Sequence, residues 1–283
     1  AGQLGNGNYA AAIAINDTST FRYNSTAAQT LSGIISGTGA LTKDNSSSTL
    51  TLSGANTYQG TTTINAGTLK LSGTHTGAGL YTVNAGGTLA GNGSTDAAIN
   101  VFGILSPGNS PGRTDTGTQT WNDGGSYTWE VDDATGAGYP AFDQTNAGVD
   151  AGWDLENITG TLELGGLTAG GFTIDIISLL PDAHTPDISG NAVGFSDYDP
   201  ISIGPDLRFE IVRTTLGVNG FDADNFTLDT SGFTNPRWSW SVVQLENSLW
   251  LEANYIIPEP STIFLVVSGG LLLYSWRWRR RRA

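Results

Sequence analysis

Paired carboxylates are the residues of this chain best suited to acid–base chemistry. They occur as Asp132 and Asp133, as Asp197 and Asp199, and as Asp222 and Asp224 followed by Asn225. Two facing carboxyl groups can act as the acid and base of a glycosidase, and an Asp-x-Asp-Asn run can bind Ca²⁺ weakly. Nothing distinguishes one pair from the others, and the calcium pattern lacks the glycine and the terminal glutamate of a complete loop. We therefore expect these carboxylates to lie in solvated loops.

The chain has two histidines and no cysteine. His75 lies among Thr and Gly residues, and His184 lies in a stretch of Pro and Asp residues. Neither has the spacing of a metal site or a catalytic triad, and without cysteine there are no disulfides or thiolate ligands. We expect both histidines to be surface-loop residues. The sequence predicts no catalytic residue, no metal and no cofactor.

Three tryptophans form the remaining candidate site. Trp238 and Trp240 alternate with serine and so share one face of a predicted strand, while Trp250 lies in the next predicted strand. Exposed rings of this kind would stack on sugar rings, whereas buried ones would fill a small β core. The sequence favours core packing, with glycan stacking on Trp238, Trp240 and Trp250 as the alternative.

Charge is distributed unevenly along the chain. Residues 1–100 contain three acidic and three basic residues, whereas residues 101–257 contain 22 acidic and four basic residues, a net charge of −18. Such a surface repels nucleic acid and anionic lipid. We expect no nucleic-acid partner.

A short repeat predicts the elements that hold these residues. The run Asn-Ala-Gly-Thr-Leu at 65–69 recurs at 84–89 with one extra Gly, so that Leu69 and Leu89 lie 20 residues apart. Leu50 lies 19 residues before Leu69, and Leu105 lies 16 after Leu89. Apolar residues at every second position, separated by Ser-Gly and Asn-Ala-Gly turns, indicate short strands. Strands stacked turn upon turn bury one continuous core. The predicted fold class is therefore all-β, a parallel β-helix or solenoid.

Residues 52–73 resemble the autotransporter-associated β-strand repeat. Asn56, Thr57, Tyr58 and Gly60 match its NTY-x-G element, and residues 64–69 match the strand that follows. The run Leu-Ser-Pro-Gly-Asn-Ser-Pro-Gly at 105–112 is similar to the LAPGNSPG turn that often ends these passengers, with Ser106 in place of Ala. The resemblance covers about residues 31–112. It implies a right-handed β-helix displayed outside the cell.

The second half of the chain is β-rich and acidic. Its apolar–polar alternation predicts strands at 127–131, 160–164, 172–176, 207–211, 238–242 and 249–252. We expect the β-helix to continue to about residue 180 and to close with an antiparallel cap from about 200 to 257. A solenoid end needs such a cap because its open edge would otherwise pair with another molecule. A separate β-sandwich for 121–257 is the alternative.

The C-terminal tail has the order of parts of a membrane segment. Residues 261–276 carry no charge and are followed by Arg277, Arg279, Arg280, Arg281 and Arg282. Sixteen apolar or neutral residues are fewer than the roughly 20 of an ordinary spanning helix, so this one short transmembrane helix suits a thin bilayer. By the positive-inside rule the arginines stay cytoplasmic, which places residues 1–257 on the far side of the inner membrane.

This tail resembles the PEP-CTERM sorting signal of Gram-negative bacteria, with Pro258, Glu259, Pro260 and Ser261 as its motif. The resemblance implies an exosortase, a membrane-embedded cysteine protease-transpeptidase, as processing partner. Such an enzyme would cut near the motif and release the body to the cell surface or the extracellular matrix. The inner-membrane anchor would then be transient.

These patterns predict three regions and one leading function. The regions are a repeat β-helix at 1–120, an acidic β-rich region of further turns and cap at 121–257, and the sorting signal at 258–283. The expected function is a non-enzymatic structural or adhesive surface protein, with exopolysaccharide as a candidate partner. The alternative is a carbohydrate-binding or polysaccharide-degrading β-helix protein.

Overall fold

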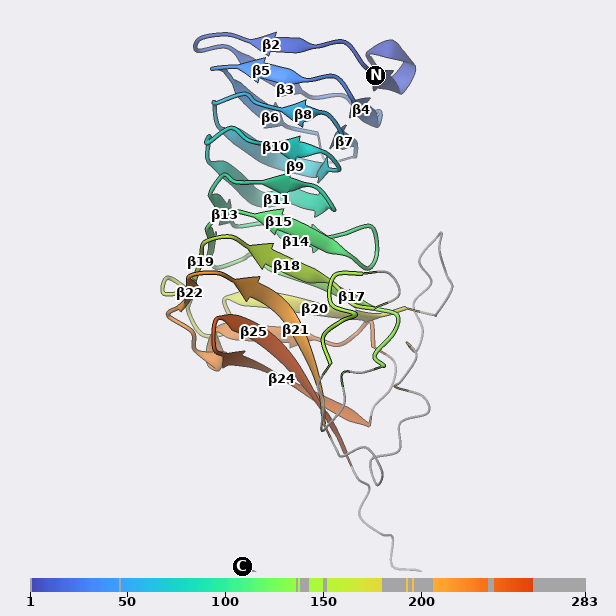
Figure 1. Cartoon of the computed structure of the whole chain (residues 1–283), viewed down its shortest axis with the longest axis vertical. Coiled ribbons are helices and arrows are strands. Elements are labelled where there is room, and N and C mark those ends of the chain that lie inside the picture. The colour runs from blue at the N-terminus through green and yellow to red at the C-terminus, as the bar shows by residue number, and fades with distance from the viewer. Residues whose placement is uncertain are drawn as a thin grey trace, which may run out of the picture.

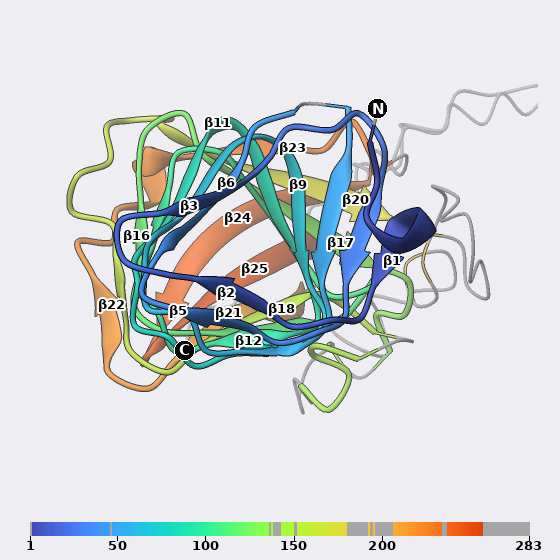
Figure 2. The same ribbon diagram turned by 90° about the horizontal axis from the view of Figure 1, so that it is seen from above.

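The structure of the chain is a computed structural model. It describes residues 2–45, 47–135, 137, 143–149, 152–179, 192, 195, 206–233 and 237–256. These residues form short strands stacked in a column, with the N-terminal strands at one end and an antiparallel hairpin at the other (Figure 1). Seen along the column, the strands of successive turns lie over one another around three sides (Figure 2). The predicted all-β class and its parallel β-helical arrangement are confirmed.

Each face of the column is a ladder of parallel strands. The first face contains β1 (Asn8–Tyr9), β4 (Gln29–Leu31), β7 (Thr49–Leu52), the second halves of β9 (Thr62–Leu71) and β11 (Tyr81–Gly91), β14 (Ile104–Pro107), β17 (Ser126–Val131), β20 (Phe172–Ser178) and β23 (Phe226–Asp229). The second contains β2 (Ile13–Ile15), β5 (Ile35–Gly37), β8 (Ala55–Asn56), β10 (Thr74–His75), β12 (Ser94–Thr95), β15 (Arg113–Thr116), β18 (Leu155–Ile158) and β21 (Asp206–Thr214). The third contains β3 (Thr20–Tyr23), β6 (Ala40–Lys43), the first halves of β9 and β11, β13 (Ile99–Val101), β16 (Gln119–Trp121), β19 (Thr161–Glu163) and β22 (Gly217–Asn219). Two 3-10 turns, η1 (Gly5–Gly7) and η2 (Ala223–Asn225), precede β1 and β23.

The register between turns is the one that the repeat predicts. Leu50 pairs with Leu69, Leu69 with Leu89, and Leu89 with Leu105. All four side chains are at most 2% exposed. Side chains at paired positions of parallel strands lie over one another, so these leucines form a continuous row inside the column. Burying each of them contributes about 1.5–3 kcal/mol to folding.

Glycines let successive turns approach at the corner between the first and second faces. A Cβ atom on Gly54 would lie 2.4 Å from the carbonyl oxygen of Gly33, and one on Gly73 would lie 2.3 Å from that of Gly54. A Cβ on Gly93 would lie 2.3 Å from the carbonyl oxygen of Gly73. These distances are shorter than any ordinary contact. The corner therefore needs residues without side chains, which explains the repeated Ser-Gly and Asn-Gly turns.

Lys43 is a charged residue inside the column, with 0% of its surface exposed. It pairs between Tyr23 and Ile64 on the third face. Its ammonium group donates to the carbonyl oxygens of Ala66, at 3.0 Å, and Asn45. Burial lowers the pKa of Lys43. Because both acceptors belong to turns between the third and first faces, this side chain ties two successive corners together from inside.

The C-terminal end of the column changes from parallel to antiparallel pairing. Strand β21 pairs antiparallel with β25 (Ser248–Tyr255), and β25 pairs antiparallel with β24 (Trp238–Leu245). Before this hairpin, β16, β19 and β22 extend the third face in parallel, as β17, β20 and β23 extend the first. The described strands after residue 121 thus join the same sheets instead of forming a separate sandwich.

Candidate functional site

The predicted sorting tail lies outside the residues that the structure describes. This applies to its motif (Pro258, Glu259, Pro260 and Ser261), to the apolar segment 261–276, and to Arg277, Arg279, Arg280, Arg281 and Arg282. In the described part of the chain, no helix has the length and apolar composition that crossing a membrane requires. The sorting signal and its transient membrane anchor stay predictions.

The three candidate tryptophans do not form one platform. Trp238 is 6% exposed, and Trp240 packs against the core with its ring centroid 6.0 Å from that of Phe209. Trp250 pairs with Val243, which lies three residues after Trp240 in β24. Because successive side chains of a strand point to opposite faces, Trp250 lies on the opposite face of the hairpin from Trp240. The positions of Trp238 and Trp240 agree with the favoured core packing. Glycan stacking on the half-buried Trp250 stays a prediction.

His75 is buried, so its prediction as a surface-loop residue is wrong. Its side chain is 1% exposed and stacks on Tyr58 at a centroid distance of 4.0 Å. Its Nε2 lies 2.8 Å from the Tyr58 carbonyl oxygen, and its Nδ1 lies 2.8 Å from the Tyr81 hydroxyl. Because a carbonyl oxygen only accepts, Nε2 carries the proton and Nδ1 accepts from Tyr81. Burial lowers the pKa of His75, which keeps the ring neutral. His184 lies outside the described residues.

The paired carboxylates differ in their surroundings. Asp222 and Asp224 are exposed, as expected, and the Asp222 side chain accepts from the backbone N–H of Asp224. Asp132 is 7% exposed and accepts a backbone N–H at 2.6 Å, so the solvated-loop prediction is wrong for it. Asp197 and Asp199 lie outside the described residues. Among the residues described, no three or more His, Asp or Glu side chains are arranged to hold a metal ion.

One corner of the column carries progressively longer connections. Between the first and second faces, three early turns are joined by residues 53–54, 72–73 and 92–93. In the next three turns the strands on either side of this corner lie further apart in the sequence: β14 ends at Pro107 and β15 begins at Arg113, β17 ends at Val131 and β18 begins at Leu155, and β20 ends at Ser178 and β21 begins at Asp206. Insertions into successive repeats lie on one side of a solenoid, which is often its binding side. This corner is the candidate functional site.

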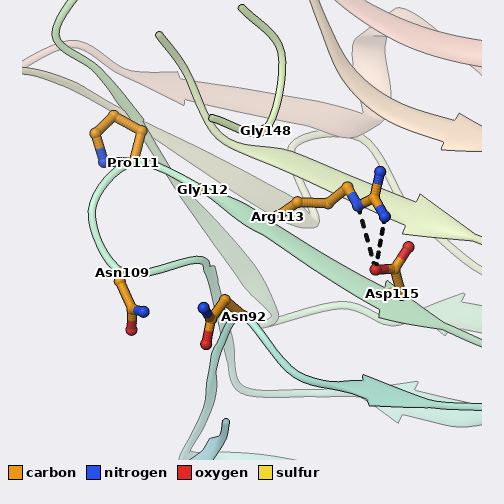
Figure 3. Close-up of a pocket in the computed structure, with 7 residues that line it drawn as sticks. All are labelled: Asn92, Asn109, Pro111, Gly112, Arg113, Asp115 and Gly148. Atoms are coloured by element: carbon orange, nitrogen blue, oxygen red, sulfur yellow. Dashed lines mark hydrogen bonds and ion pairs between the residues drawn. The ribbon is translucent and has the colours of Figure 1, made fainter. Parts of the chain in front are cut away.

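A cleft of about 410 Å³ opens at this corner (Figure 3). It is lined by Asn92, Asn109, Pro111, Gly112, Arg113, Asp115 and Gly148. An antiparallel bridge between Gly91 and Gly108 brings the following residues, Asn92 and Asn109, onto adjoining turns. Both asparagines are exposed. The cleft therefore combines residues from a short turn, from the Ser-Pro-Gly-Asn-Ser-Pro-Gly turn, and from the long connection after β17.

Arg113 and Asp115 form the charged part of the cleft. The Arg113 Nε and Nη2 atoms donate to Asp115 Oδ2 at 3.2 and 3.0 Å (Figure 3). The other oxygen, Oδ1, accepts from Asn157 Nδ2 at 2.6 Å. The guanidinium and the carboxylate neutralise each other. The hydrogen bond from Asn157, which lies on the next turn of the column, holds the carboxylate in place. The pair is half exposed, so its contribution to stability is small.

Asp154 holds the backbone of the turn that lines the cleft. It is fully buried, its Oδ1 accepts the Gly112 N–H at 2.7 Å, and its Oδ2 accepts the Glu130 N–H at 3.0 Å. The Ser110 hydroxyl donates to the Glu130 carboxylate. Burial, with the neighbouring Glu130, raises the pKa of Asp154 well above its ordinary value. The turn that forms one wall of the cleft is thus held by hydrogen bonds to the buried Asp154 and the half-buried Glu130.

Glu156 lies deeper in the column and is 1% exposed. Its Oε1 accepts from Gln119 Nε2 and, at 3.3 Å, from Thr116 Oγ1. Gln119 Oε1 in turn accepts from Trp121 Nε1 at 2.8 Å. Burial raises the pKa of Glu156 to about 8. This acid serves as an interior hydrogen-bond acceptor within an apolar core.

The cleft residues were not predicted as a site from the sequence. The available signal was the turn at 105–112, followed directly by Arg113 and Asp115 two residues apart, and the loss of regular repeat spacing after it. Carboxamides, a guanidinium and a carboxylate offer donors and acceptors to a polar ligand. An apolar ligand would need a different lining.

Comparison with known proteins bears on the first half of the column. Residues 41–71 match the model of the passenger-associated-transport-repeat family. This stretch runs from β6 through β7 and β8 to the end of β9, about one and a half turns of the column. The predicted resemblance to autotransporter-associated repeats is confirmed there. A search of curated proteins finds no match to the chain.

Proposed function

We propose that the protein is a non-enzymatic structural or adhesive element of the cell surface or extracellular matrix of a Gram-negative bacterium. The observation that supports this most is the continuous β-helical column, closed by an antiparallel hairpin. A column with one unbroken core is stiff and acts as a spacer without turnover. The similarity of residues 41–71 to a passenger-associated repeat supports an exported, surface-displayed protein.

The C-terminal tail supplies the sorting step of this proposal. The Pro-Glu-Pro-Ser motif, the uncharged segment 261–276 and the arginines after it form an address that an exosortase-type protease recognises and removes. Residues 1–257 then leave the inner membrane for the surface or the matrix, where exopolysaccharide is the expected partner.

Fractionation of the native host tests this proposal. Deleting residues 258–283 should leave the body folded and move it from the surface to the periplasm. A triple variant, Pro258→Ala/Glu259→Ala/Pro260→Ala, keeps the apolar segment and should remain uncleaved in the inner membrane. Circular dichroism of the truncated body is the control for folding. Normal surface amounts of either variant would refute the sorting proposal.

A carbohydrate-binding protein is the second candidate, and the polar cleft at the long-connection corner favours it. Polysaccharide degradation is a further alternative, which reducing-end release from candidate exopolysaccharides tests. Turnover by the purified protein would contradict the non-enzymatic proposal, whereas binding without turnover agrees with an adhesive role.

A further inference from the structure

The cleft at the long-connection corner has features of a built site. Its three walls come from different turns of the column, and hydrogen bonds hold the backbone of two of them. Asp154 holds the Gly112 N–H, and the Gly148 N–H donates to the Trp153 carbonyl oxygen at 2.6 Å. A site whose backbone is already held loses little entropy when it binds a ligand.

The lining groups suit hydroxyls. Each carboxamide of Asn92 and Asn109 presents a carbonyl acceptor and an NH₂ donor, and no described residue bonds to either side chain. Arg113 keeps further N–H groups beyond the two that Asp115 accepts, and its side chain is 47% exposed. A sugar hydroxyl donates and accepts at once, so it matches such a mixed lining. A phosphate or carboxylate would need cations that are not already paired.

Charge decides between neutral and acidic sugars. The guanidinium in the cleft is neutralised by Asp115 at 3.0 Å. Residues 101–257, to which most of the lining belongs, carry 22 acidic and four basic residues. This field lowers the local concentration of anionic polymers. A uronic-acid chain is therefore disfavoured over a neutral one.

We propose that the cleft lined by Asn92, Asn109, Arg113 and Asp115 binds a segment of neutral, hydroxyl-rich polysaccharide. Asn92 and Asn109 hydrogen-bond to hydroxyls at one end, and the Arg113–Asp115 pair does so at the other. Asp154 is a positioning residue that holds the turn carrying Asn109. This inference rests on the proposed adhesive function and gives that function a ligand class and a site.

Isothermal titration of the full chain in detergent tests the site, with cellohexaose, maltohexaose and hexagalacturonate as probes. At least one neutral hexasaccharide should bind, and the double variant Asn92→Ala/Asn109→Ala should weaken that binding by about tenfold or more. Asn16→Ala, an exposed asparagine in the turn between β2 and β3, is the matched control and should bind as the wild type does. Trp250→Ala should also leave binding unchanged, which separates the cleft from ring stacking.

Three results would overturn the proposal. They are no binding of either neutral hexasaccharide at millimolar concentration, undiminished binding by the double variant, or tighter binding of hexagalacturonate. Surface fractionation of the same variants keeps the two proposals apart. Loss of sugar binding with normal surface display would leave the sorting proposal intact, whereas wild-type protein retained in the inner membrane would refute sorting without touching the cleft.

Discussion

Replacing Glu156 by Gln should stabilise the protein at neutral and alkaline pH and leave it unchanged in acid. The introduced glutamine side chain would keep an Oε1 acceptor for Gln119 and would stay neutral at every pH. The folded-state pKa of Glu156 is raised from 4.5 to about 8. A group whose pKa is raised by folding contributes stability that is complete below its unfolded value and is lost as pH rises to the folded value. The relevant window therefore runs from about pH 4.5 to about pH 8.

The size of the effect follows from the shift. At about 1.4 kcal/mol per pKa unit, a rise from 4.5 to about 8 corresponds to about 5 kcal/mol as an upper limit. Wild type should thus lose up to that much free energy of unfolding, relative to the Glu156→Gln variant, between pH 4 and pH 9. Asp154 also has a raised pKa, chiefly through burial and in part through the Glu156 charge, so the Glu156→Gln variant also relieves that part of the Asp154 shift and adds to the difference in the same direction.

Urea unfolding at several pH values, followed by tryptophan fluorescence, measures this difference. Glu163→Gln is the matched control, because Glu163 is partly exposed and accepts from Asn219 on the outside of the column. The control should follow wild type at every pH. If the Glu156→Gln and wild-type curves also stay parallel from pH 4 to pH 9, then Glu156 is not a buried, protonated acid.

Three further predictions concern the column and its cap. Gly73→Ala should lower the thermal midpoint by several degrees, because its Cβ would lie 2.3 Å from the carbonyl oxygen of Gly54. Folding lowers the pKa of His75, so the stability that its neutral ring contributes is complete above about pH 6.5 and is lost as pH falls below it. The urea midpoint of the His75→Gln variant should therefore depend less on pH between pH 7 and pH 5 than the wild-type midpoint does. Trp240→Ala should lower the free energy of unfolding by about 3–5 kcal/mol, and Trp250→Ala by much less, when both are measured by urea unfolding.

Each of these has a result that would count against it. Gly165→Ala is the control for the corner glycine, since a Cβ there meets nothing within 4 Å, and equal effects of the two substitutions would contradict the close approach. For His75, wild type and variant with the same acid dependence would show that another group governs it. A larger loss for Trp250→Ala than for Trp240→Ala would reverse the assignment of the cap faces.

The apolar rows of the column could be predicted from the sequence because they repeat locally. Leu50, Leu69, Leu89 and Leu105 lie 16 to 20 residues apart, and an Asn-Ala-Gly run precedes two of them, Leu69 and Leu89. In later turns the paired positions lie further apart in the sequence. Ile174 pairs with Tyr127 across 47 residues, because a long connection intervenes. The continuation of the column can therefore be predicted only from the strand patterns.

Buried polar residues were the harder part, since polarity ordinarily predicts exposure. Lys43, His75 and Glu156 point inward because their partners, which are turn carbonyls and hydroxyl or amide groups, come from neighbouring turns. No local pattern reveals such partners. The cleft was missed for the same reason, because Asn92, Arg113 and Gly148 come together only when three turns stack.

The intact mass of the protein recovered from the cell surface and the matrix is the decisive measurement for display outside the cell. We predict a body that ends near Pro258, without the apolar segment and the arginines, and that keeps its β-rich circular dichroism spectrum. Protein that still ends at Ala283 and is found only in the inner membrane would contradict display outside the cell.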